Sequence, residues 1–247
     1  MNQVIELMMN HKSVRKFTNE PISQEVVHAI VEAAQMAPTS TMYQAYSIIS
    51  ITDEAVKSKL AKINNQAYTK DNGHLFVFCA DMFRLYEAVP DKEAVQVPIE
   101  STENLIVAVA DASLAAQNAV IAAESLGLGT VFLGSIRNDI EQVNELLDLP
   151  QYVIPLFALA IGIPDPNNQV QIKPRLPKEA VHFTNQYRQD TKELIHAYDN
   201  TMEAYLSNRG SNARVDNWSN SVFRSLQNKS RLDVGEFVRK KGLNRND

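Results

Sequence analysis

Hydrophobic and polar positions along the chain follow two periods, which predict strands and helices in mixed order. Alternating or fully apolar runs rich in β-branched residues predict strands at residues 45–52, 75–80, 130–133 and 153–162. Apolar residues at helical spacing predict helices at residues 4–9, 24–37, 54–64, 103–126, 138–147, 191–206 and 216–241. Residues 88–101 hold two prolines without firm periodicity, so a loop is expected there.

Two of these elements indicate how the core is built. The strand at 75–80 is apolar throughout, so both of its faces should be buried. The helix at 103–126 carries small residues around much of its circumference, which suits a central helix packed closely by neighbours or by a second subunit. Gly127 and Gly129 are expected to end it. No linker-like stretch divides the chain, so residues 1–247 are expected to form a single domain.

Composition and charge limit the class of protein. The chain of 247 residues is 45% hydrophobic and 21% charged, which is typical of an ordinary globular protein. A net charge of −5 argues against a dedicated nucleic-acid binder. Residues 207–247 nevertheless carry nine Lys and Arg against four Asp and Glu. This basic segment suits a dinucleotide phosphate, a nucleic acid or an acidic partner, and equally a helical surface with scattered salt bridges.

The sequence predicts a cytoplasmic protein without a membrane span. Cys79 is the only cysteine, which fits a reducing compartment, and its apolar strand predicts a buried, inert thiol. The first residues lack a secretory pattern, and the longest uninterrupted apolar run, 152–164, is too short to span a bilayer. Glycine spacing excludes a Rossmann fingerprint and a P-loop, and the five histidines show no metal-ligand spacing. Any chemistry would then belong to a cofactor.

Cations and hydroxyls near loops are the remaining candidates for ligand binding. The stretch from His11 to Phe17 combines an imidazole, a hydroxyl and three cations without a carboxylate, which suits a phosphate or the carbonyl edge of a heterocycle. A solvated basic turn is the alternative. A hydroxyl-rich loop at 39–41 follows a predicted helix end, and the segment 173–177 holds Lys173 and Arg175 between prolines.

Taken together, these features resemble the nitroreductase superfamily, in its NADPH-dependent branch of oxygen-insensitive nitroreductases and flavin reductases. The resemblance covers essentially the whole chain. The motifs that carry it are His11-Lys12-Ser13-Val14-Arg15-Lys16-Phe17, Ala116-Gln117-Asn118-Ala119, 122–129, Gly162, Lys173-Pro174-Arg175-Leu176-Pro177, Arg209-Gly210-Ser211-Asn212 and Asp216-Asn217-Trp218-Ser219.

The resemblance implies an α+β fold with a central mixed, mostly antiparallel sheet flanked by helices. It implies one nitroreductase-like domain over 1–247, with a C-terminal helical extension from about residue 190 to 247. It further implies a homodimer with two FMN sites at the subunit interface, and NADPH as electron donor. Nitroaromatics, quinones or free flavin would be reduced by ping-pong hydride transfer.

The resemblance also implies roles for individual residues. His11, Ser13, Lys173 and Arg175 would hold the FMN phosphate, with Lys12 beside them. Arg15 would stabilise negative charge at the pyrimidine edge of the flavin. The remaining flavin contacts would be Thr39, Ser40, Thr41 and Gln66 from the partner subunit, with Phe132, Leu133 and Gly134 lining the ring. Arg209 and Arg214 would bind the 2′-phosphate of NADPH.

Three other functions stay open at this point. A flavin reductase could supply reduced FMN to a partner oxygenase. A flavin-binding protein with little turnover would hold FMN that NAD(P)H cannot bleach. A scaffold whose basic segment docks nucleic acid would bind no flavin and would show salt-sensitive binding.

Overall fold

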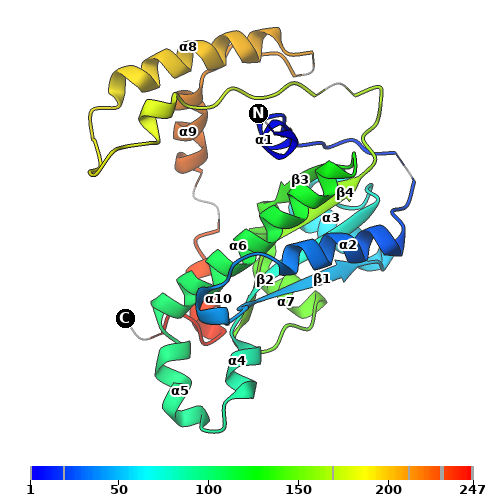
Figure 1. Cartoon of the computed structure of the whole chain (residues 1–247), viewed down its shortest axis with the longest axis vertical. Coiled ribbons are helices and arrows are strands. Elements are labelled where there is room, and N and C mark those ends of the chain that lie inside the picture. The colour runs from blue at the N-terminus through cyan, green and yellow to red at the C-terminus, as the bar shows by residue number, and fades with distance from the viewer. Residues whose placement is uncertain (1, 19, 169, 211, 229–230, 246–247) are drawn as a thin grey trace. The chain divides into compact units, whose positions relative to one another are not determined.

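The computed structural model describes residues 2–18, 20–168, 170–210, 212–228 and 231–245 (Figure 1). The chain divides into two compact units. The first runs to Asn168 and resumes at Arg231, and the second lies between Gln169 and Ser230. That residues 1–247 act as one domain stays a prediction. The end of the predicted C-terminal extension, from Arg231 on, belongs to the first unit.

A four-stranded sheet with the order β1-β2-β4-β3 forms the centre of the first unit. Its strands are β1 (Tyr46–Ile51), β2 (His74–Asp81), β3 (Gly129–Leu133) and β4 (Val153–Gly162). Each neighbouring pair of strands is antiparallel. Every residue of β2 is buried, as its apolar run predicted, because β2 lies inside the sheet and is covered on both faces.

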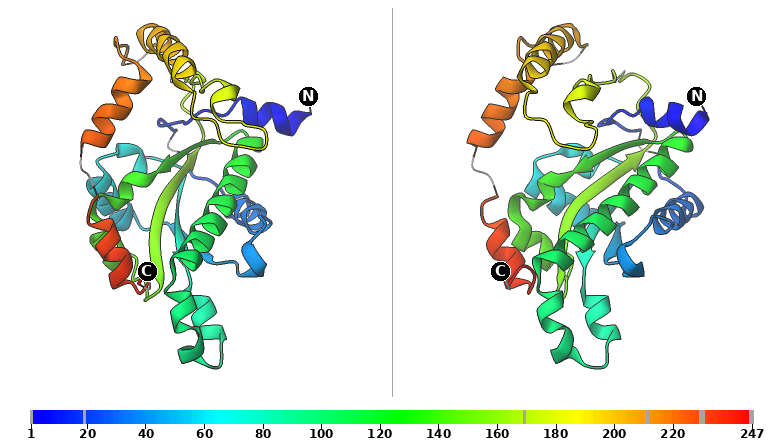
Figure 2. Two further views of the ribbon diagram at one scale, coloured as in Figure 1. Left: turned by 90° about the vertical axis from the view of Figure 1, so that its left-hand side faces the viewer. Right: turned by 60° about the vertical axis from the view of Figure 1, so that its left-hand side comes forward.

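Side chains of β2 alternate between two apolar cores, one on each face of the sheet. Phe76 and Phe78 point into the first core, and Leu75 and Val77 point into the second. The first core is covered by α2 (Gln24–Gln35) and α6 (Thr102–Ser125), and the second by α3 (Glu54–Asn64) and α7 (Ile140–Leu146). Figure 2 shows α2 and α6 on one side of the sheet and α3 on the other.

The long helix α6 is the central helix that its small residues predicted. Its buried positions are Ala108, Asp111, Ala112, Ala115, Ala116, Ala119, Val120 and Ala123. Alanines let α2 and the sheet approach its axis closely. By length and composition α6 could cross a membrane, and among the described residues it is the one helix that meets that test. Its packing in the core of the first unit explains the same apolar composition.

Local signals begin α2 and α3 where they were predicted. The side chain of Ser23 caps α2 by accepting a hydrogen bond from the backbone N–H of Val26. Asp53 caps α3 in the same way, and the bounds of α3 equal the predicted ones. The first helix is α1 (Gln3–Met9), and a 3₁₀ turn at Gly134–Asp139 precedes α7.

The predicted loop at 88–101 is wrong. Helices α4 (Phe83–Ala88) and α5 (Lys92–Ile99) occupy this region. Asp91 caps α5 by accepting a hydrogen bond from the backbone N–H of Ala94. Pro90 precedes this cap and Pro98 lies in the last turn, so the two prolines flank a short helix instead of preventing one.

The predicted single helix at 216–241 is also wrong. The described part of this region forms α9 (Trp218–Gln227) in the second unit and α10 (Val234–Lys240) in the first. Phe237 and Val238 of α10 are buried in the first core, and Lys241 donates a hydrogen bond to the carbonyl oxygen of Leu149. Because Phe237 and Val238 are buried in the core of the first unit, α10 is a helix distinct from α9 of the second unit.

Helix α8 (Lys192–Asn208) organises the second unit. Its Tyr198 packs edge-on against Trp218 at the start of α9, with ring centroids 5.8 Å apart. The Tyr198 hydroxyl donates to the carbonyl oxygen of Pro174 at 3.0 Å, which ties the segment of Lys173 and Arg175 to α8. A short 3₁₀ turn, Lys178–Ala180, follows that segment.

Candidate functional site

The basic stretch His11–Phe17 lies in extended form along the edge of the sheet. Ser13 forms a parallel bridge with Thr130 of β3, and the backbone N–H of Val14 donates to the carbonyl oxygen of Thr130 at 2.9 Å. Phe17 bridges Pro164 beyond the end of β4. The sheet therefore fixes the course of this stretch between α1 and α2.

Side chains of the stretch are not sorted by simple alternation. Val14 is buried, His11 and Ser13 are half-buried, and Lys12 and Arg15 are exposed. Arg15 makes a long contact of 3.5 Å from Nη1 to the carbonyl oxygen of Ser13. Two cations and a hydroxyl are thus presented on an anchored backbone, which is a donor set for an anion.

Gly129 allows the close approach of the stretch to β3. A Cβ placed at Gly129 would lie 2.7 Å from the Cβ of Val14, which is closer than carbon atoms can approach. Gly127, with φ at +78°, ends α6 as predicted, whereas Gly129 belongs to β3 and has this packing role.

His11 is held by an acidic partner that the sequence reading missed. Its Nδ1 lies 2.7 Å from Oε1 of Glu124, and the hydroxyl of Thr130 donates to the same oxygen at 2.7 Å. The Glu124 side chain is only 12% exposed, and its Oε1 contacts both His11 and Thr130. His11 is predicted to bind the FMN phosphate. Because its Nδ1 contacts Glu124, only its Nε2 could contact that phosphate. The signal in the sequence was an acidic residue within the otherwise small and apolar face of 103–126.

Asp111 is a second acidic residue that the sequence reading missed. Its Oδ1 accepts from the backbone N–H of Ser40, and its Oδ2 accepts from that of Ala45, each at 3.0 Å. Asp111 is 1% exposed and lies on the buried face of α6. One buried carboxylate therefore fixes both ends of the loop from Ser40 to Ala45, which begins within the hydroxyl-rich segment 39–41.

The loop between these ends has a strained backbone. Thr41, Met42 and Gln44 have φ of +50°, +58° and +51°, a conformation that side chains with a Cβ rarely adopt. Thr39 is half-buried, whereas Ser40 and Thr41 are exposed. The predicted hydroxyl groups of Ser40 and Thr41 are therefore accessible on a loop of defined shape.

The end of β3 presents an aromatic ring beside the basic stretch. Phe132 is 40% exposed and packs edge-on against Phe157, with ring centroids 5.2 Å apart. Leu133 is 2% exposed, so its side chain belongs to the core and only its backbone could line a ligand. Gly134 is half-buried, as is Gln66, which follows α3.

The second unit carries four further candidate cations. Lys173 and Arg175 are exposed, and Arg175 donates from Nη1 to the carbonyl oxygen of Lys173 at 2.8 Å. Arg209 donates from Nε to the carbonyl oxygen of Asn212, and Arg214 donates from Nε to Asp216 at 3.1 Å. Ser211, part of the same motif, lies outside the described residues.

Other candidate chemistry is not supported. Cys79 is buried, as predicted, and burial raises its pKa to about 12, which disfavours the reactive thiolate. Within the described ranges, no group of three His, Cys, Asp or Glu side chains could hold a metal ion. What the site offers is cations, hydroxyls and an exposed aromatic ring.

Comparison with known proteins gives the family. The model described as "Nitroreductase family" matches residues 8–163, and "Nitroreductase family, C-terminal domain" matches residues 173–246. An FMN reductase (NADPH) of Bacillus subtilis is 41% identical, with both chains covered in full. A Cr(VI) reductase of a Pseudomonas strain is 46% identical over 98% of this chain and 99% of its own. The solved structure of the NfrA1 nitroreductase from B. subtilis has a TM-score of 0.94 at 40% identity, covering 99% of this chain and 100% of that one. The predicted resemblance and fold class are confirmed: the chain belongs to the nitroreductase family.

Proposed function

We propose that this protein is an FMN-dependent NADPH oxidoreductase that reduces free flavin, nitroaromatics or quinones. The observation that carries the proposal is the basic stretch anchored along β3 beside the exposed ring of Phe132. The relatives named above support it, since one is an FMN reductase that uses NADPH and another a nitroreductase. The relative named for Cr(VI) reduction indicates that the electron acceptor varies within the family.

The residues present fit FMN. A phosphate needs cationic and hydroxyl donors, which Lys12 and Ser13 supply on an anchored backbone, while the neighbouring Arg15 is left for the flavin ring. An isoalloxazine ring needs an aromatic or apolar surface, which Phe132 supplies two residues beyond Thr130 on the same strand. When bound, FMN would supply the transfer of hydride and electrons between NADPH and the acceptor.

Arg15 is the side chain that we assign to flavin electrostatics. Its guanidinium is exposed and always charged, and the bridge of Ser13 to Thr130 fixes the backbone that carries it. A positive charge fixed in advance near N1 and O2 of the flavin would stabilise the negative charge that develops there. The chain itself would bind and orient the reactants, and the assigned flavin and NADPH ligands stay predictions.

A spectroscopic experiment tests the function. The purified protein should show a flavin absorption band, and anaerobic NADPH should bleach it much faster than NADH does. A flavin band that neither nucleotide bleaches would instead indicate a flavin-binding protein with little turnover. A colourless protein that added FMN cannot reconstitute would refute the proposal.

We further propose that two subunits build each flavin site. Glu124, which holds His11, and Asp111, which holds the loop at Ser40, are thirteen residues apart on α6. At 1.5 Å per residue they are separated by about 20 Å. A separation of this length favours flavin contacts from two chains over contacts from two regions of one chain. Contributions from two chains would bring the 11–15 stretch of one subunit to the 39–41 loop of the other.

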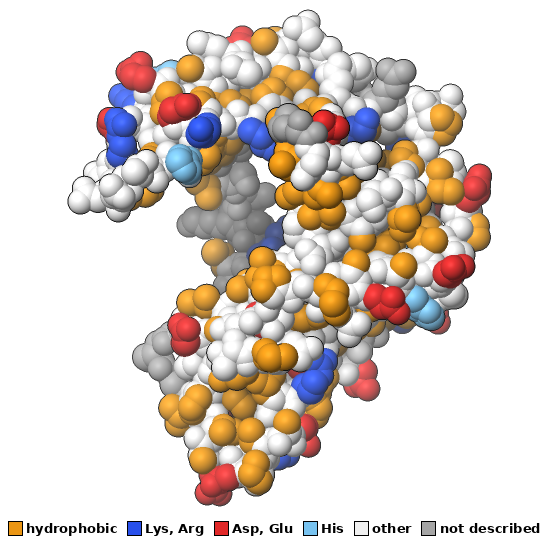
Figure 3. All heavy atoms as spheres, viewed as in Figure 1, with side chains coloured by type: hydrophobic (Ala, Val, Ile, Leu, Met, Phe, Trp, Pro, Cys, Tyr) orange, Lys and Arg blue, Asp and Glu red, His pale blue; other side chains and the backbone are white. Residues whose placement is uncertain are grey.

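Exposed apolar side chains support a homodimer. They lie on α1 and on the outer side of α6, two helices that pack together in the first unit. They include Val4, Met8, Met9, Ile106 and Leu114, each at least 45% exposed. Figure 3 shows hydrophobic side chains exposed along α6. An exposed apolar surface of this kind is typical of a subunit interface.

Subunit complementation tests the shared site. Arg15→Ala and Asp111→Ala impair different regions, so each variant alone should lose most of its NADPH-dependent flavin reduction. Mixed dimers of the two contain one site with both changes and one site with neither. Activity should therefore reappear after the variants are refolded together. Mixtures that form dimers yet stay as inactive as the separate variants would contradict the shared site.

We also propose a cytoplasmic location, in line with the one buried cysteine.

A further inference from the structure

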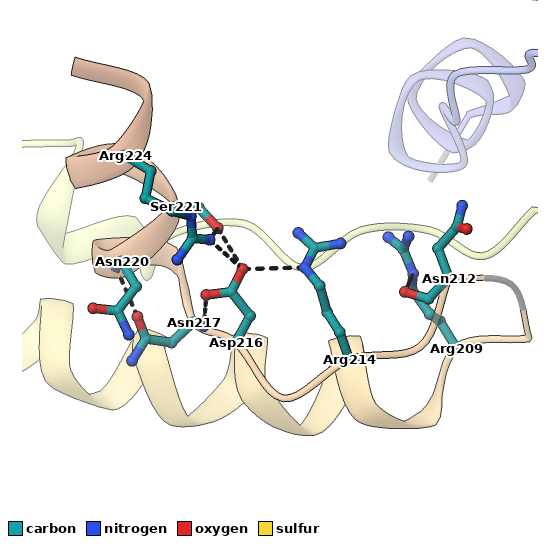
Figure 4. Close-up of polar contacts among 8 residues, drawn as sticks. All are labelled: Arg209, Asn212, Arg214, Asp216, Asn217, Asn220, Ser221 and Arg224. Carbon is teal, nitrogen blue, oxygen red and sulfur yellow. Dashed lines mark hydrogen bonds and ion pairs between the residues drawn. The ribbon is translucent and has the colours of Figure 1, made fainter. Parts of the chain in front are cut away.

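Two arginines of the second unit share a single carboxylate. Oδ2 of Asp216 accepts from Nε of Arg214 at 3.1 Å, from Nη2 of Arg224 at 2.5 Å and from the hydroxyl of Ser221 at 3.1 Å. Its Oδ1 accepts from the backbone N–H of Asn217 at 3.0 Å. Figure 4 shows Arg214 and Arg224 reaching the carboxylate from opposite directions, one from the segment before α9 and one from α9 itself. The carboxylate thus joins two cations that are ten residues apart in sequence.

Most donors of both guanidiniums stay available in this arrangement. An arginine has five N–H donors, and Arg214 uses only Nε on Asp216. Arg224 uses Nη2, which contacts Asp216 and the hydroxyl of Ser221. The side chains of Arg214 and Arg224 are 47% and 58% exposed, whereas that of Asp216 is 6% exposed. The acid is covered and the cations face outward.

The cluster keeps a positive charge of fixed geometry. The hydrogen bonds from Arg224 and Arg214 lower the pKa of Asp216 to about 2, so Asp216 is ionised at neutral pH. Two guanidiniums and one carboxylate leave a net charge of +1, and Arg209 of the same segment adds another. In Figure 4 the side chains of Arg209 and Arg214 point to the same side of that segment. A dianionic phosphate monoester matches such a group of planar forks better than a single carboxylate does.

We propose that Arg224 is a further residue that determines the preference for NADPH, contacting its 2′-phosphate together with Arg214, and that Asp216 is the positioning residue that holds both. The inference rests on the proposed function and on the prediction that Arg209 and Arg214 bind the 2′-phosphate. A purely structural link between α9 and the preceding segment would need one arginine on Asp216. The second arginine restores the positive charge that the acid removes.

Arg224→Gln in the FMN-loaded protein is the first test. The KM for NADPH should rise about tenfold, as expected for one lost charge-assisted hydrogen bond, while the KM for NADH changes less than about twofold. Adenosine 2′,5′-bisphosphate, which contains no nicotinamide, should bind about tenfold more weakly by calorimetry, and adenosine 5′-monophosphate should bind as before. Arg224→Lys keeps the charge and loses the fork, so it should recover part of the loss.

Arg188→Gln is the matched control. It removes the same charge from an exposed pair with Asp190 in the same unit. The side-chain hydrogen bonds of Arg188 go to Asp190, before the start of α8, and not to Asp216, Arg214 or Arg224. Both nucleotides should therefore behave as with the wild type.

Asp216→Asn tests the positioning role by the sign of its effect. The change makes the cluster one charge more positive. An acid that only neutralises its surroundings would make adenosine 2′,5′-bisphosphate bind more tightly when replaced. An acid that holds two guanidiniums in place would make binding weaker, which is the result we expect. Tighter binding would overturn the positioning role.

The two proposals fail in different ways. A wild-type protein that uses NADH and NADPH equally well would overturn the NADPH preference and this inference with it. A wild type that prefers NADPH, and loses the preference in Arg209→Gln but not in Arg224→Gln, would overturn the role of Arg224 alone. Circular dichroism and a thermal melt of Arg224→Gln and Arg224→Lys would show whether both variants are folded when these constants are measured.

Discussion

Asp111→Asn should release the loop that carries Thr39, Ser40 and Thr41. In the wild type, the two carboxylate oxygens accept from the backbone N–H groups of Ser40 and Ala45, both at 3.0 Å. The amide of asparagine keeps one acceptor and turns an NH₂ group toward the other N–H. One hydrogen bond to a charged group is lost, and a donor then faces a donor.

The size of the effect follows from the balance within the loop. Two hydrogen bonds to a carboxylate contribute about 3–6 kcal/mol together. Left-handed conformations at Thr41, Met42 and Gln44 cost about 1 kcal/mol or more each, so about 3 kcal/mol in total. Loss of one hydrogen bond therefore removes most of the free energy by which the two bonds exceed the cost of the left-handed conformations. We expect the free energy of loop opening to fall by about 2 kcal/mol, which corresponds to about thirtyfold more frequent opening.

Hydrogen exchange followed by mass spectrometry measures this directly. Peptides that cover residues 39–46 should exchange about thirtyfold faster in Asp111→Asn, whereas peptides from α3 should not change. Asp71→Asn, at an exposed position, is the matched control and should leave both regions as in the wild type. The affinity for FMN, measured by flavin fluorescence, should fall in Asp111→Asn alone. Unchanged exchange at 39–46 would refute the clamp and the strain argument together.

Three further predictions concern stability and catalysis. Burial, with a smaller contribution from Lys57, lowers the pKa of His74 from an ordinary 6.5 to about 4. Between pH 6.5 and pH 4 His74 is therefore protonated in the unfolded chain but neutral in the folded one, which favours unfolding as the pH falls. Unfolding free energy should therefore drop by up to about 3 kcal/mol from pH 7 to pH 4, and urea titrations of His74→Gln should show a smaller drop; equal drops would contradict this. Gly129→Ala should lower the free energy of unfolding by about 1–3 kcal/mol because its Cβ collides with Val14, whereas Gly210→Ala, with open space around it, should have little effect in the same titration. Arg15→Ala should slow the anaerobic reduction of flavin by NADPH more than it weakens FMN binding, and stopped-flow rates equal to the wild type would exclude the electrostatic role.

Local patterns were sufficient for most of the fold. The bounds of α3 and β4 equal the predicted ones, because an Asp cap and a ten-residue apolar run are signals within the segment itself. The donors of the basic stretch were visible for the same reason, since their residue types are enough to indicate an anion. Helix α5 escapes the sequence pattern because two prolines in its region resemble helix breaks, although Pro90 precedes its cap and Pro98 lies in its last turn.

Long-range contacts decided the rest. His11 meets Glu124 across 113 positions, and Ser40 and Ala45 meet Asp111 across 71 and 66. No period in the sequence pairs residues so far apart. Packing of α6 against the sheet and α2 brings these acids to the loops that they hold. The sequence by itself therefore determined the family, the main strands and helices and the kinds of ligand donors. Only the tertiary structure decided which acids fix those donors in place, because a buried carboxylate finds its donors through folding and not through spacing along the chain.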